Sequence, residues 1–565
     1  MSDIIHAKVE YKTMRELVET IGEKYAEKPS FTLRLKPRDP EPIKKSYKEL
    51  RDDVRALATE LLSRGLGGKH ICVIGKHSYP WVVSYFATLC AGCVLVPLDR
   101  DWAAEDLAAT VAKAEGSLVL IDPDITDKAA SIMETAGLSE YFTLDVGEDA
   151  AENSLEALMA AGREKLNAGN RSYFDREIDP DKLSLLVFTS GTTGKGKGVM
   201  LSQTAILKDL SEIIPYIDFG KKTVNVLPPH HTYGSSVTLL GHASIGIEIY
   251  ISAGLRYILK ELETEQPEHL ILVPLYLETF YRRIQANIKS QGKEKLVRRM
   301  IKISNALRKV GIDLRRKFFG QILKAFGGKL KLIICGGAPI NHEMLDFFEA
   351  IGVRVLNGYG ITECAPIVAV NHSRRVVKGS VGFPIAINEI KIDDPNEDGE
   401  GEILVRGCNV MLGYFKDEAA TREAMTEDGF FRTGDYGKLG KNGALYITGR
   451  KKNLIILSNG KNVYPEEIES EFVAIPGLLD IIVYEGKSNR GSDYDAIVAE
   501  IFPDYDYLEK NGITDATAYF QKYVDDFNTT CVAYKKIGVL KVRTEDFPKN
   551  TLRKIMRFKL DTSID

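Results

Sequence analysis

The chain has 565 residues, of which 44% are hydrophobic and 27% charged, and its formal net charge at pH 7 is −4. A chain of this length can bury large cores and is expected to form two or more domains. The composition is that of an ordinary globular protein, and the slightly negative charge excludes a globally basic nucleic-acid binder, so no nucleic-acid partner is expected.

The sequence predicts a cytoplasmic protein. No N-terminal segment joins a basic start to an apolar core, and no apolar run reaches transmembrane length, so we expect neither a signal peptide nor a membrane span. Seven cysteines lie in apolar or motif segments without the paired spacing of metal ligands, which predicts reduced and buried thiols. They are Cys72, Cys90, Cys93, Cys335, Cys364, Cys408 and Cys531.

Helical and strand patterns alternate along the first 380 residues. Ser46 and Glu49 match a capping box in front of an apolar helical stripe, and strands are expected over residues 71–74, 93–98 and 117–121. Repeated strand–helix–strand units predict an α/β fold with parallel or mixed sheets and helices on both faces. After about residue 380, short runs such as 389–393 and 401–406 predict a smaller β subdomain.

A loop rich in glycine and hydroxyl side chains follows an expected buried strand at residues 183–188. Glycines allow the backbone N–H groups to approach an anion, hydroxyls add donors and lysines add charge, which predicts a phosphate-binding loop. A Walker A loop is excluded, because Gly198 stands where a serine or threonine should hold Mg²⁺. The expected loop consists of Thr189, Ser190, Gly191, Thr192, Thr193, Gly194, Lys195 and Lys197.

This loop resembles the phosphate loop of the acyl-adenylate-forming (AMP-binding) superfamily, and further motifs follow in that family's order. The resemblance also has a departure, since Gly196 replaces the usual proline and implies a more mobile loop. The matching residues are Gly336, Gly337, Ala338 and Pro339, then Gly358, Tyr359, Gly360, Thr362 and Glu363, and finally Asp435, Arg450 and Lys554.

The resemblance implies a role for each of these residues. Gly336 to Pro339 would form the wall beside the adenine, against which Tyr359 would lie, and Thr362 would contact the α-phosphate. The other implied roles are a Mg²⁺ ligand for Glu363, a ribose-hydroxyl acceptor for Asp435, a ribose and phosphate contact for Arg450, and the adenylation lysine for Lys554.

Family resemblance also implies a hinge at Lys452. It would join a large N-terminal domain, residues 1–451 with the β subdomain at about 380–451, to a small mobile α+β domain, residues 452–565. Asn453 replaces the acidic residue usual beside the hinge, which leaves the family's local salt bridge open. Gly460 would line a tunnel for the pantetheine arm of CoA, where a side chain would obstruct the thiol.

The segment around His231 bears on the acyl substrate. The family places a histidine or aromatic residue here, near the reacting carboxylate, whereas His230 is expected to be structural. Residues 232–246 contain no charged side chain, and Gly234 stands where relatives that activate amino acids place an aspartate. A plain carboxylic acid, and by resemblance a medium-chain or long-chain fatty acid, is therefore favoured over an amino acid.

These motifs together predict an ATP-dependent and Mg²⁺-dependent ligase that forms acyl-AMP and then transfers the acyl group to the thiol of CoA. Two alternatives stay open. The acceptor could be an acyl carrier protein, or the chain could be a non-catalytic nucleotide-binding homologue. Retention of Glu363, Asp435, Arg450 and Lys554 argues against the second alternative.

Residues 281–331 are strongly basic, with sixteen lysines and arginines against two acidic residues. Leu296, Met300, Ile303, Leu307 and Val310 keep helical spacing, which predicts an amphipathic basic helix resembling insertions in long-chain fatty acyl-CoA synthetases. Four interpretations are open: a solvated face, peripheral contact with an anionic membrane, a site for the phosphates of CoA, or a dock for an acidic carrier protein. We expect an anion-facing surface made of Arg298, Arg299, Lys302, Arg315, Arg316 and Lys317.

Overall fold

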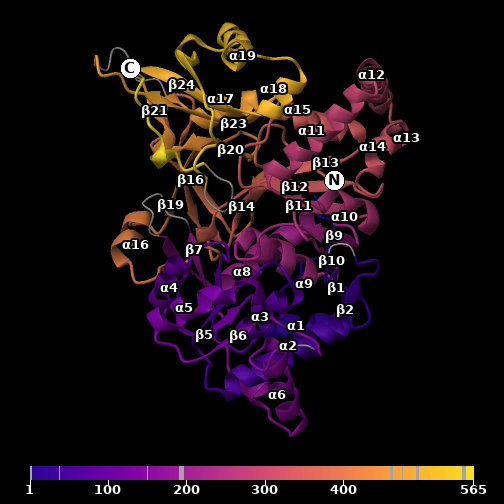
Figure 1. Cartoon of the computed structure of the whole chain (residues 1–565), viewed down its shortest axis with the longest axis vertical. Helices are drawn as coiled ribbons and strands as arrows, with labels where there is room; N and C mark the ends of the chain where they lie inside the picture. Colours follow the sequence, from indigo (N-terminus) through magenta and orange to yellow (C-terminus); the bar gives the residue numbers. More distant parts are fainter. Residues whose placement is uncertain are drawn as a thin grey trace.

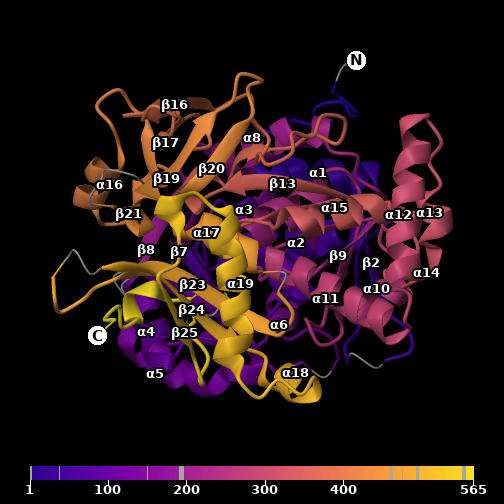
Figure 2. The same cartoon turned by 90° about the horizontal axis from the view of Figure 1, so that it is seen from above.

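The computed structural model describes residues 3–36, 39–148, 150–189, 196–457, 462–473, 475–491, 495–549 and 555–564. The predicted α/β class is confirmed: two large sheets carry helices on both faces, with two smaller β-containing units stacked above them (Figure 1). The C-terminal residues lie over one end of the larger body, as the view from above also shows (Figure 2).

One large sheet contains the strands expected from the first motifs. The four strands expected at 71–74, 93–98, 117–121 and 183–188 are present as β3 (His70–Ile74), β4 (Val94–Leu98), β5 (Gly116–Ile121) and β7 (Leu183–Thr189). Together with β6 (Tyr141–Thr143) they form the parallel part of the sheet. β8 (Lys197–Ser202) and β18 (Gly413–Tyr414) add antiparallel strands, giving the order β18-β8-β7-β4-β3-β5-β6 in the described chain.

Helices cover both faces of this sheet. α4 (Ala104–Lys113) and α5 (Ala129–Ala136) bury apolar side chains against one face. The other face meets α1 (Met14–Lys24), α2 (Tyr47–Ser63), α3 (Tyr79–Cys90) and α6 (Leu155–Asn167), with the short α7 (Ser172–Asp175) beside α2. The expected capping box is present: the Ser46 hydroxyl accepts from the Glu49 N–H, and the Ser46 N–H donates to the Glu49 carboxylate.

The second large sheet has a parallel centre and antiparallel edges. Its strands are β1 (Pro29–Leu33), β2 (Ile43–Ser46), β9 (Lys222–Asn225), β10 (Glu248–Ile251), β11 (His269–Leu272), β12 (Leu332–Gly336), β13 (Arg354–Gly360), β14 (Ile367–Val370) and β15 (Phe383–Pro384). Their order is β15-β14-β13-β12-β11-β9-β10-β1-β2. One face packs on α10 (Ile258–Glu265), α11 (Pro274–Ser290) and α15 (His342–Ile351), while α8 (Gln203–Ile213) and α9 (His242–Ser244) belong to the core shared with the other sheet.

Two smaller units complete the fold. The expected strands 389–393 and 401–406 are β16 and β17 of an antiparallel sheet, β16 (Glu389–Asp393), β17 (Gly401–Arg406), β19 (Phe431–Leu439) and β20 (Leu445–Arg450), with α16 (Glu418–Ala424) alongside. After a short ribbon of β21 (Ile455–Ile456) and β22 (Asn462–Val463), the last unit has a separate core. It contains α17 (Pro465–Phe472), β23 (Leu478–Gly486), β24 (Ala496–Pro503), α18 (Tyr505–Lys510), α19 (Ala516–Thr530) and β25 (Val539–Val542).

The basic region is helical, but of the expected apolar stripe only Met300 packs on the core. Its helices after α11 are α12 (Glu294–Lys309), α13 (Arg315–Phe318) and α14 (Gly320–Lys324). Val297, Met300 and Ile301 pack on the core, whereas Leu296 and Ile303 of the expected stripe are 52% and 44% exposed. Both stripes are apolar, so spacing alone does not show which of them docks.

Two arginines of the expected anion-facing surface serve the fold instead. Arg315 forms ion pairs with Asp313 at 2.6 Å and with Glu349 at 2.8 Å. Arg316 donates to the backbone carbonyls of Leu330 at 2.8 Å and Gly328 at 2.6 Å. The expectation that these two guanidinium groups face an external anion is therefore wrong.

The cysteine prediction holds for five residues of seven. Cys408 is exposed and Cys531 partly exposed, while the other five are buried, and all seven thiols are free. Cys408 follows the last strand residue of β17 in a surface turn, where flanking apolar residues gave a misleading signal of burial. Within the described ranges, no helix is both long enough and apolar enough to cross a membrane.

Candidate active site

A cleft of 3130 Å³ lies between the two large sheets, the small sheet of β16, β17, β19 and β20, and the C-terminal unit. Most of the described candidate residues line it: Thr189, Lys197, His231, Gly337, Ala338, Pro339, Gly358, Tyr359, Gly360, Thr362, Glu363, Asp435, Arg450 and Lys452. Gly336 is described but does not line the cleft. Candidates outside the described residues are Ser190, Gly191, Thr192, Thr193, Gly194, Lys195, Gly460 and Lys554.

The two ends of the expected phosphate loop are held by paired strands. Thr189 of β7 lies opposite Lys197 of β8, and the Thr189 hydroxyl donates to the Lys197 carbonyl at 3.4 Å. Gly196 approaches the same turn so closely that an added Cβ would lie 2.7 Å from the Thr189 carbonyl oxygen. In this backbone conformation the close approach therefore favours glycine at position 196, independently of any effect on mobility.

Lys197 and Glu363 are connected through one tyrosine. The Lys197 ammonium lies 4.6 Å from the centre of the Tyr414 ring, and the Tyr414 hydroxyl donates to Glu363 Oε1 at 3.0 Å. Pairing of β18 with β8 brings Tyr414 to this place. Burial, together with the Glu363 charge, raises the pKa of Tyr414, so the phenol stays neutral and able to donate.

The turn that carries Thr362 and Glu363 rests on a buried polar pair. The Asn409 side-chain amide donates to Asp209 Oδ1 at 3.1 Å and to the Cys364 carbonyl at 2.9 Å, while Asp209 Oδ2 accepts from the Ile367 N–H at 3.2 Å. Burial raises the pKa of Asp209 well above its ordinary value. Neither residue can be recognised from the sequence alone, because an aspartate inside a helix and an asparagine in a turn carry no distinctive signal.

Gly337, Gly358 and Gly360 line the side of the cleft where the wall beside the adenine is expected. Gly336 at the end of β12 lies opposite Gly358 of β13, and Gly337 has a φ of +96°, which favours glycine. An added Cβ on Gly360 would lie 2.3 Å from the Pro366 carbonyl oxygen. A flat, side-chain-free surface results next to Tyr359, which suits contact with a planar base.

Asp435 receives two donors from residues that the sequence analysis selected. The Tyr359 hydroxyl donates to Asp435 Oδ2 at 2.6 Å, and Arg450 Nε lies 3.1 Å from Asp435 Oδ1, because β19 and β20 pair these residues across the sheet. Burial and the Asp435 charge raise the pKa of Tyr359 well above its ordinary value. A carboxylate has further lone-pair positions, so two hydroxyl donors can share this nearly buried group.

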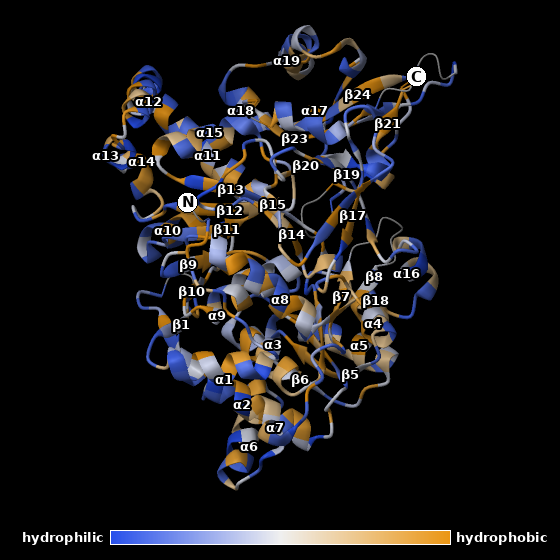
Figure 3. Cartoon of the chain, turned by 180° about the vertical axis from the view of Figure 1, so that it is seen from behind, coloured by the Kyte–Doolittle hydropathy of each residue, from blue (hydrophilic) through white to orange (hydrophobic). Residues whose placement is uncertain are grey.

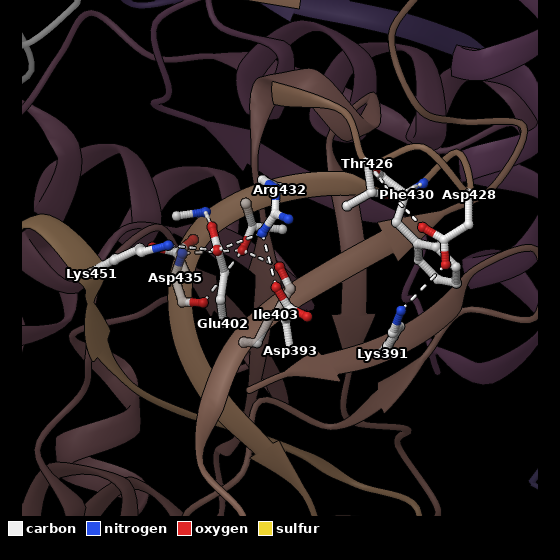
Figure 4. Close-up of polar contacts among 12 residues, drawn as sticks. Lys391, Asp393, Glu402, Ile403, Thr426, Asp428, Phe430, Arg432, Asp435 and Lys451 are labelled. Carbon is white, nitrogen blue, oxygen red and sulfur yellow. Dashed lines mark hydrogen bonds and ion pairs between the residues drawn. The ribbon is translucent and has the colours of Figure 1, made fainter. Parts of the chain in front are cut away.

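Glu402 holds the β19 segment that presents Asp435 (Figure 4). Its Oε2 accepts from Lys451 Nζ at 2.8 Å and Arg432 Nη1 at 3.2 Å, and its Oε1 accepts from the Gly434 N–H at 3.3 Å. Glu402 is only 5% exposed, so two cations and a backbone donor replace its lost hydration. A single glutamate in a β run gave no sign of this in the sequence.

The segment around Lys452 joins the two sides of the cleft. On one side Lys451 pairs with Glu402, and on the other the Asn453 amide donates to Glu466 Oε1 at 2.5 Å, in the first turn of α17. Asn453 thus makes a local link by hydrogen bond at the position where the family resemblance implies an acidic side chain. Burial and the neighbouring Arg450 charge lower the pKa of Lys452.

The acyl side of the cleft contains neutral imidazoles. Burial lowers the pKa of His231 to about 3, and no described residue hydrogen-bonds to its Nε2. His230 lies 3.5 Å from Asp99 Oδ2 and burial lowers its pKa to about 4. Gly234 is the second residue of a π-helical segment (Tyr233–Gly241), and an added Cβ there would lie 2.1 Å from the Pro228 carbonyl oxygen, so no side chain fits.

The chain matches the family model described as AMP-binding enzyme over residues 18–415. It belongs to the AMP-binding enzyme family. One relative is the guinea-pig (Cavia porcellus) long-chain-fatty-acid–CoA ligase 1, which is 30% identical over 82% of this chain and 70% of its own. The Arabidopsis thaliana long-chain-fatty-acid–[acyl-carrier-protein] ligase AEE15, chloroplastic, is 28% identical over 85% of this chain and 75% of its own.

Solved structures of adenylate-forming enzymes share the fold of this AMP-binding enzyme. ATP-bound MatB from Rhodopseudomonas palustris is 25% identical, covers 96% of this chain and 97% of its own, and superposes with a TM-score of 0.74. The anthranilate CoA ligase AuaEII, in complex with anthranoyl-AMP, has a TM-score of 0.77 at 17% identity, over 98% of this chain and 97% of its own. The second likeness concerns the fold alone.

Proposed function

We propose that this AMP-binding enzyme activates a medium-chain or long-chain fatty acid in two steps. In the first, a carboxylate oxygen attacks the α-phosphorus of ATP, the bond from that phosphorus to the pyrophosphate oxygen breaks, and acyl-AMP forms. In the second, the thiol of CoA loses its proton and attacks the acyl carbon, and AMP leaves with the electron pair of the acyl–oxygen bond. The convergence of Tyr359, Asp435 and Arg450 in one cleft carries this proposal.

The nucleotide would occupy the wall between Gly337 and Tyr359. Asp435 would accept both ribose hydroxyls, which a carboxylate does with two oxygens, and Arg450 would stay beside it as the balancing cation. Thr362 and Lys197 line the same cleft on the phosphate side, where a hydroxyl donor and an ammonium group stabilise negative charge. Thr189 and the loop residues Ser190 to Lys195 would complete this cradle.

Glu363 fits the proposed Mg²⁺ site. Magnesium in nucleotide enzymes binds one or two carboxylates, with water and substrate phosphates supplying the remaining oxygens. Tyr414 occupies Oε1 of Glu363, and no described residue hydrogen-bonds to Oε2, so one oxygen is free to bind a metal. Bound Mg²⁺ would offset the charge of the phosphates, while Tyr414 fixes the direction of the carboxylate.

The acyl side supports an uncharged chain. Gly234 has no room for the aspartate that would recognise an ammonium group, and neutral His231 can approach a carboxylate without an ion pair. The fatty-acid names of the relatives point the same way. An acyl carrier protein is the second candidate acceptor, because one relative is named for that activity and the basic region 281–331 could meet an acidic partner.

The second half-reaction would need a movement of residues 452–565 against residues 1–451, with the β subdomain at about 380–451 on the larger side. Lys452 is the proposed pivot, flanked by the Lys451–Glu402 and Asn453–Glu466 contacts. Gly460 would then line the pantetheine tunnel.

The basic region 281–331 is a candidate for peripheral membrane contact.

Lys554 provides the decisive test. As the proposed adenylation lysine it should stabilise charge at phosphorus, which matters only in the first step. Lys554→Ala should abolish pyrophosphate release while thioester formation from supplied acyl-AMP stays within about twofold. Lys559→Ala, nearby and outside the motif, is the matched control.

The same assay identifies the acid and the acceptor. Pyrophosphate release is measured with straight-chain acids of two to eighteen carbons, with CoA, with a carrier protein and with neither. Failure of the unaltered protein on all acids would favour a non-catalytic nucleotide-binding homologue. Equal loss of both half-reactions in a folded Lys554→Ala protein would contradict the assigned role.

A further inference from the structure

Helix α12 repeats a lysine followed by an apolar residue every seven positions. Seven residues are nearly two helical turns, so the members of each set lie above one another along the helix. The apolar ridge consists of Leu296, Ile303 and Val310, and the lysine ridge of Lys295, Lys302 and Lys309. Each lysine precedes its apolar neighbour by one residue, so the two ridges lie about 100° apart around the helix, with the exposed Arg299 between them.

The apolar ridge is exposed although a different apolar stripe is available for packing. Leu296, Ile303 and Val310 are 52%, 44% and 72% exposed, and Ile312 beyond the helix is 47% exposed. The core instead receives Val297, Met300 and Ile301. Single exposed apolar residues are normal in a folded protein, but an aligned row of them is a feature of interaction surfaces.

The lysine ridge is not needed to hold the fold together. Within the described residues, none of its three ammonium groups has a carboxylate partner or a hydrogen bond, and the same is true of Arg299 on the apolar side. Other cations of the basic region do serve the structure, since Arg308 pairs with Glu349 at 2.9 Å and Arg315 with Asp313. The lysine ridge and Arg299 thus place four exposed cations without such a partner on α12.

The position of α12 allows this side to meet a large surface. The helix stands at the rim of the molecule, with α11 and α15 on its inner side (Figures 1 and 2). Coloured by hydropathy, it shows hydrophobic and hydrophilic residues next to each other along its length (Figure 3). A flat partner can therefore contact both ridges at once.

A groove of 810 Å³ runs beneath the helix, between α11, α12 and α15. Asp346 and Glu349 line both this groove and the active-site cleft, so the two hollows adjoin. A surface docked on α12 would lie beside this groove.

We propose that the two ridges of α12 form a docking surface for an anionic lipid bilayer. The apolar ridge enters the boundary between headgroups and acyl chains, and the lysine ridge lies over the lipid phosphates, as in other helices that lie in the plane of a membrane. Anionic lipid is the occupant that complements both features, because an acidic protein would satisfy the lysines but leave the apolar ridge without an acyl phase. Docking on the bilayer would give the enzyme access to fatty acids dissolved in the membrane. This benefit rests on the proposed function, but the docking itself does not.

The test measures sedimentation of the full-length protein with vesicles in the absence of substrates. Wild type should bind vesicles that contain phosphatidylserine and not vesicles of phosphatidylcholine alone, and binding should weaken with added salt. The triple variant Lys295→Gln, Lys302→Gln, Lys309→Gln should lower the partition coefficient on the order of 100-fold. The triple variant Leu296→Ser, Ile303→Ser, Val310→Ser should lower it at high and low salt alike, because this contribution is not electrostatic.

A matched control changes three exposed lysines outside the basic region, Lys69→Gln, Lys510→Gln and Lys522→Gln, and should bind vesicles like wild type. Turnover of a soluble medium-chain acid reports on the active site separately and should stay within about twofold in every variant. Unchanged vesicle binding in both ridge variants would overturn the proposal. So would a lysine-ridge variant that keeps vesicle binding but shows a raised KM for CoA, or that loses binding only to an acidic carrier protein.

Discussion

Asp435 is the residue at which the proposed nucleotide site can be tested most directly. It accepts from Tyr359 at 2.6 Å and pairs with Arg450 at 3.1 Å, and would accept the ribose hydroxyls. Asp435→Asn keeps the shape but loses the charge, so we expect the KM for ATP to rise roughly ten- to hundredfold, since hydrogen bonds to charged groups contribute about 1.5–3 kcal/mol.

Steady-state pyrophosphate release at varied ATP measures this effect. The control is Asp428→Asn, an exposed aspartate of the same subdomain that pairs with Lys391 at 3.2 Å and should leave the KM unchanged (Figure 4). If Asp435→Asn binds ATP as wild type does, the ribose is not held at this carboxylate.

Tyr414 should tune the proposed metal site through Glu363. Tyr414→Phe removes the hydroxyl that donates to Glu363 Oε1 but keeps the ring beside Lys197. The carboxylate then loses its fixed direction, and we expect the Mg²⁺ concentration for half-maximal activity to rise about tenfold while kcat at saturating Mg²⁺ falls less. Tyr436→Phe, on β19, is the control. A kcat loss that Mg²⁺ does not relieve would show that Tyr414 acts elsewhere.

Residue types in ordered motifs predicted the members of the site but not the contacts that support them. Tyr359, Asp435 and Arg450 were selected from sequence, and the fold brings them together. Tyr414 and Glu402 were not, because each reaches its partner through strand pairing between segments distant in the chain. One sequence shows which side chains are chemically suited to a task, but only the sheet register shows which of them meet.

At the level of elements, the continuous apolar runs and the apolar stripe of α2 were predicted reliably, whereas the packing face of α12 was not. β3, β4, β5 and β7 were predicted within about two residues, since strands buried on both faces have little choice of environment. The α12 region was predicted helical, but with two apolar stripes its docking face depended on tertiary packing. The π-helix at Tyr233–Gly241 could not be predicted, because its geometry departs from the periods that sequence patterns report.

Helix α17 should make stability depend on pH through Glu469. Burial raises the pKa of Glu469 to about 7 although Arg557 pairs with it and favours its ionised form. The folded protein therefore holds this proton more tightly than the unfolded chain, whose value is about 4.5. The stabilisation is fully present below pH about 4.5 and is lost as pH rises towards about 7.

Glu469→Gln removes this titration. The loss of unfolding free energy between pH 5 and pH 8 should shrink by about 2 kcal/mol relative to wild type, measured by urea unfolding. Glu471→Gln, on the exposed side of the same helix, should keep the wild-type dependence. An unchanged pH profile in Glu469→Gln would mean that this carboxyl is ionised in the folded protein at pH 5.

At the scale of the whole molecule, the cleft has walls from both sides of one short connection. The large sheets supply the proposed phosphate and adenine surfaces, the C-terminal unit supplies the opposite wall, and the chain crosses between them at Lys452. Lys451 is tied to Glu402 on one side and Asn453 to Glu466 on the other. A rotation that leaves both contacts intact must therefore take place at the backbone of Lys452.

Lys452→Pro tests this pivot by fixing φ near −65°. If the C-terminal unit must rotate between the half-reactions, pyrophosphate release should stay within about threefold, while thioester formation from supplied acyl-AMP should fall tenfold or more, on the order of the losses seen when closing motions are blocked. Rapid-quench assays of the two half-reactions measure these rates separately.

Two controls separate the backbone from the side chain and from proline itself. Lys452→Ala removes the ammonium group but leaves φ free, so it should retain the second half-reaction better than Lys452→Pro. Lys441→Pro places proline at the second position of the turn closed by the Gly443 N–H to Gly440 carbonyl bond, where proline is tolerated, and should have no effect. If Lys452→Pro forms thioester at the wild-type rate, rotation takes place at another residue or is not required; if both half-reactions fall equally in the folded variant, Lys452 belongs to the adenylation site rather than to a hinge.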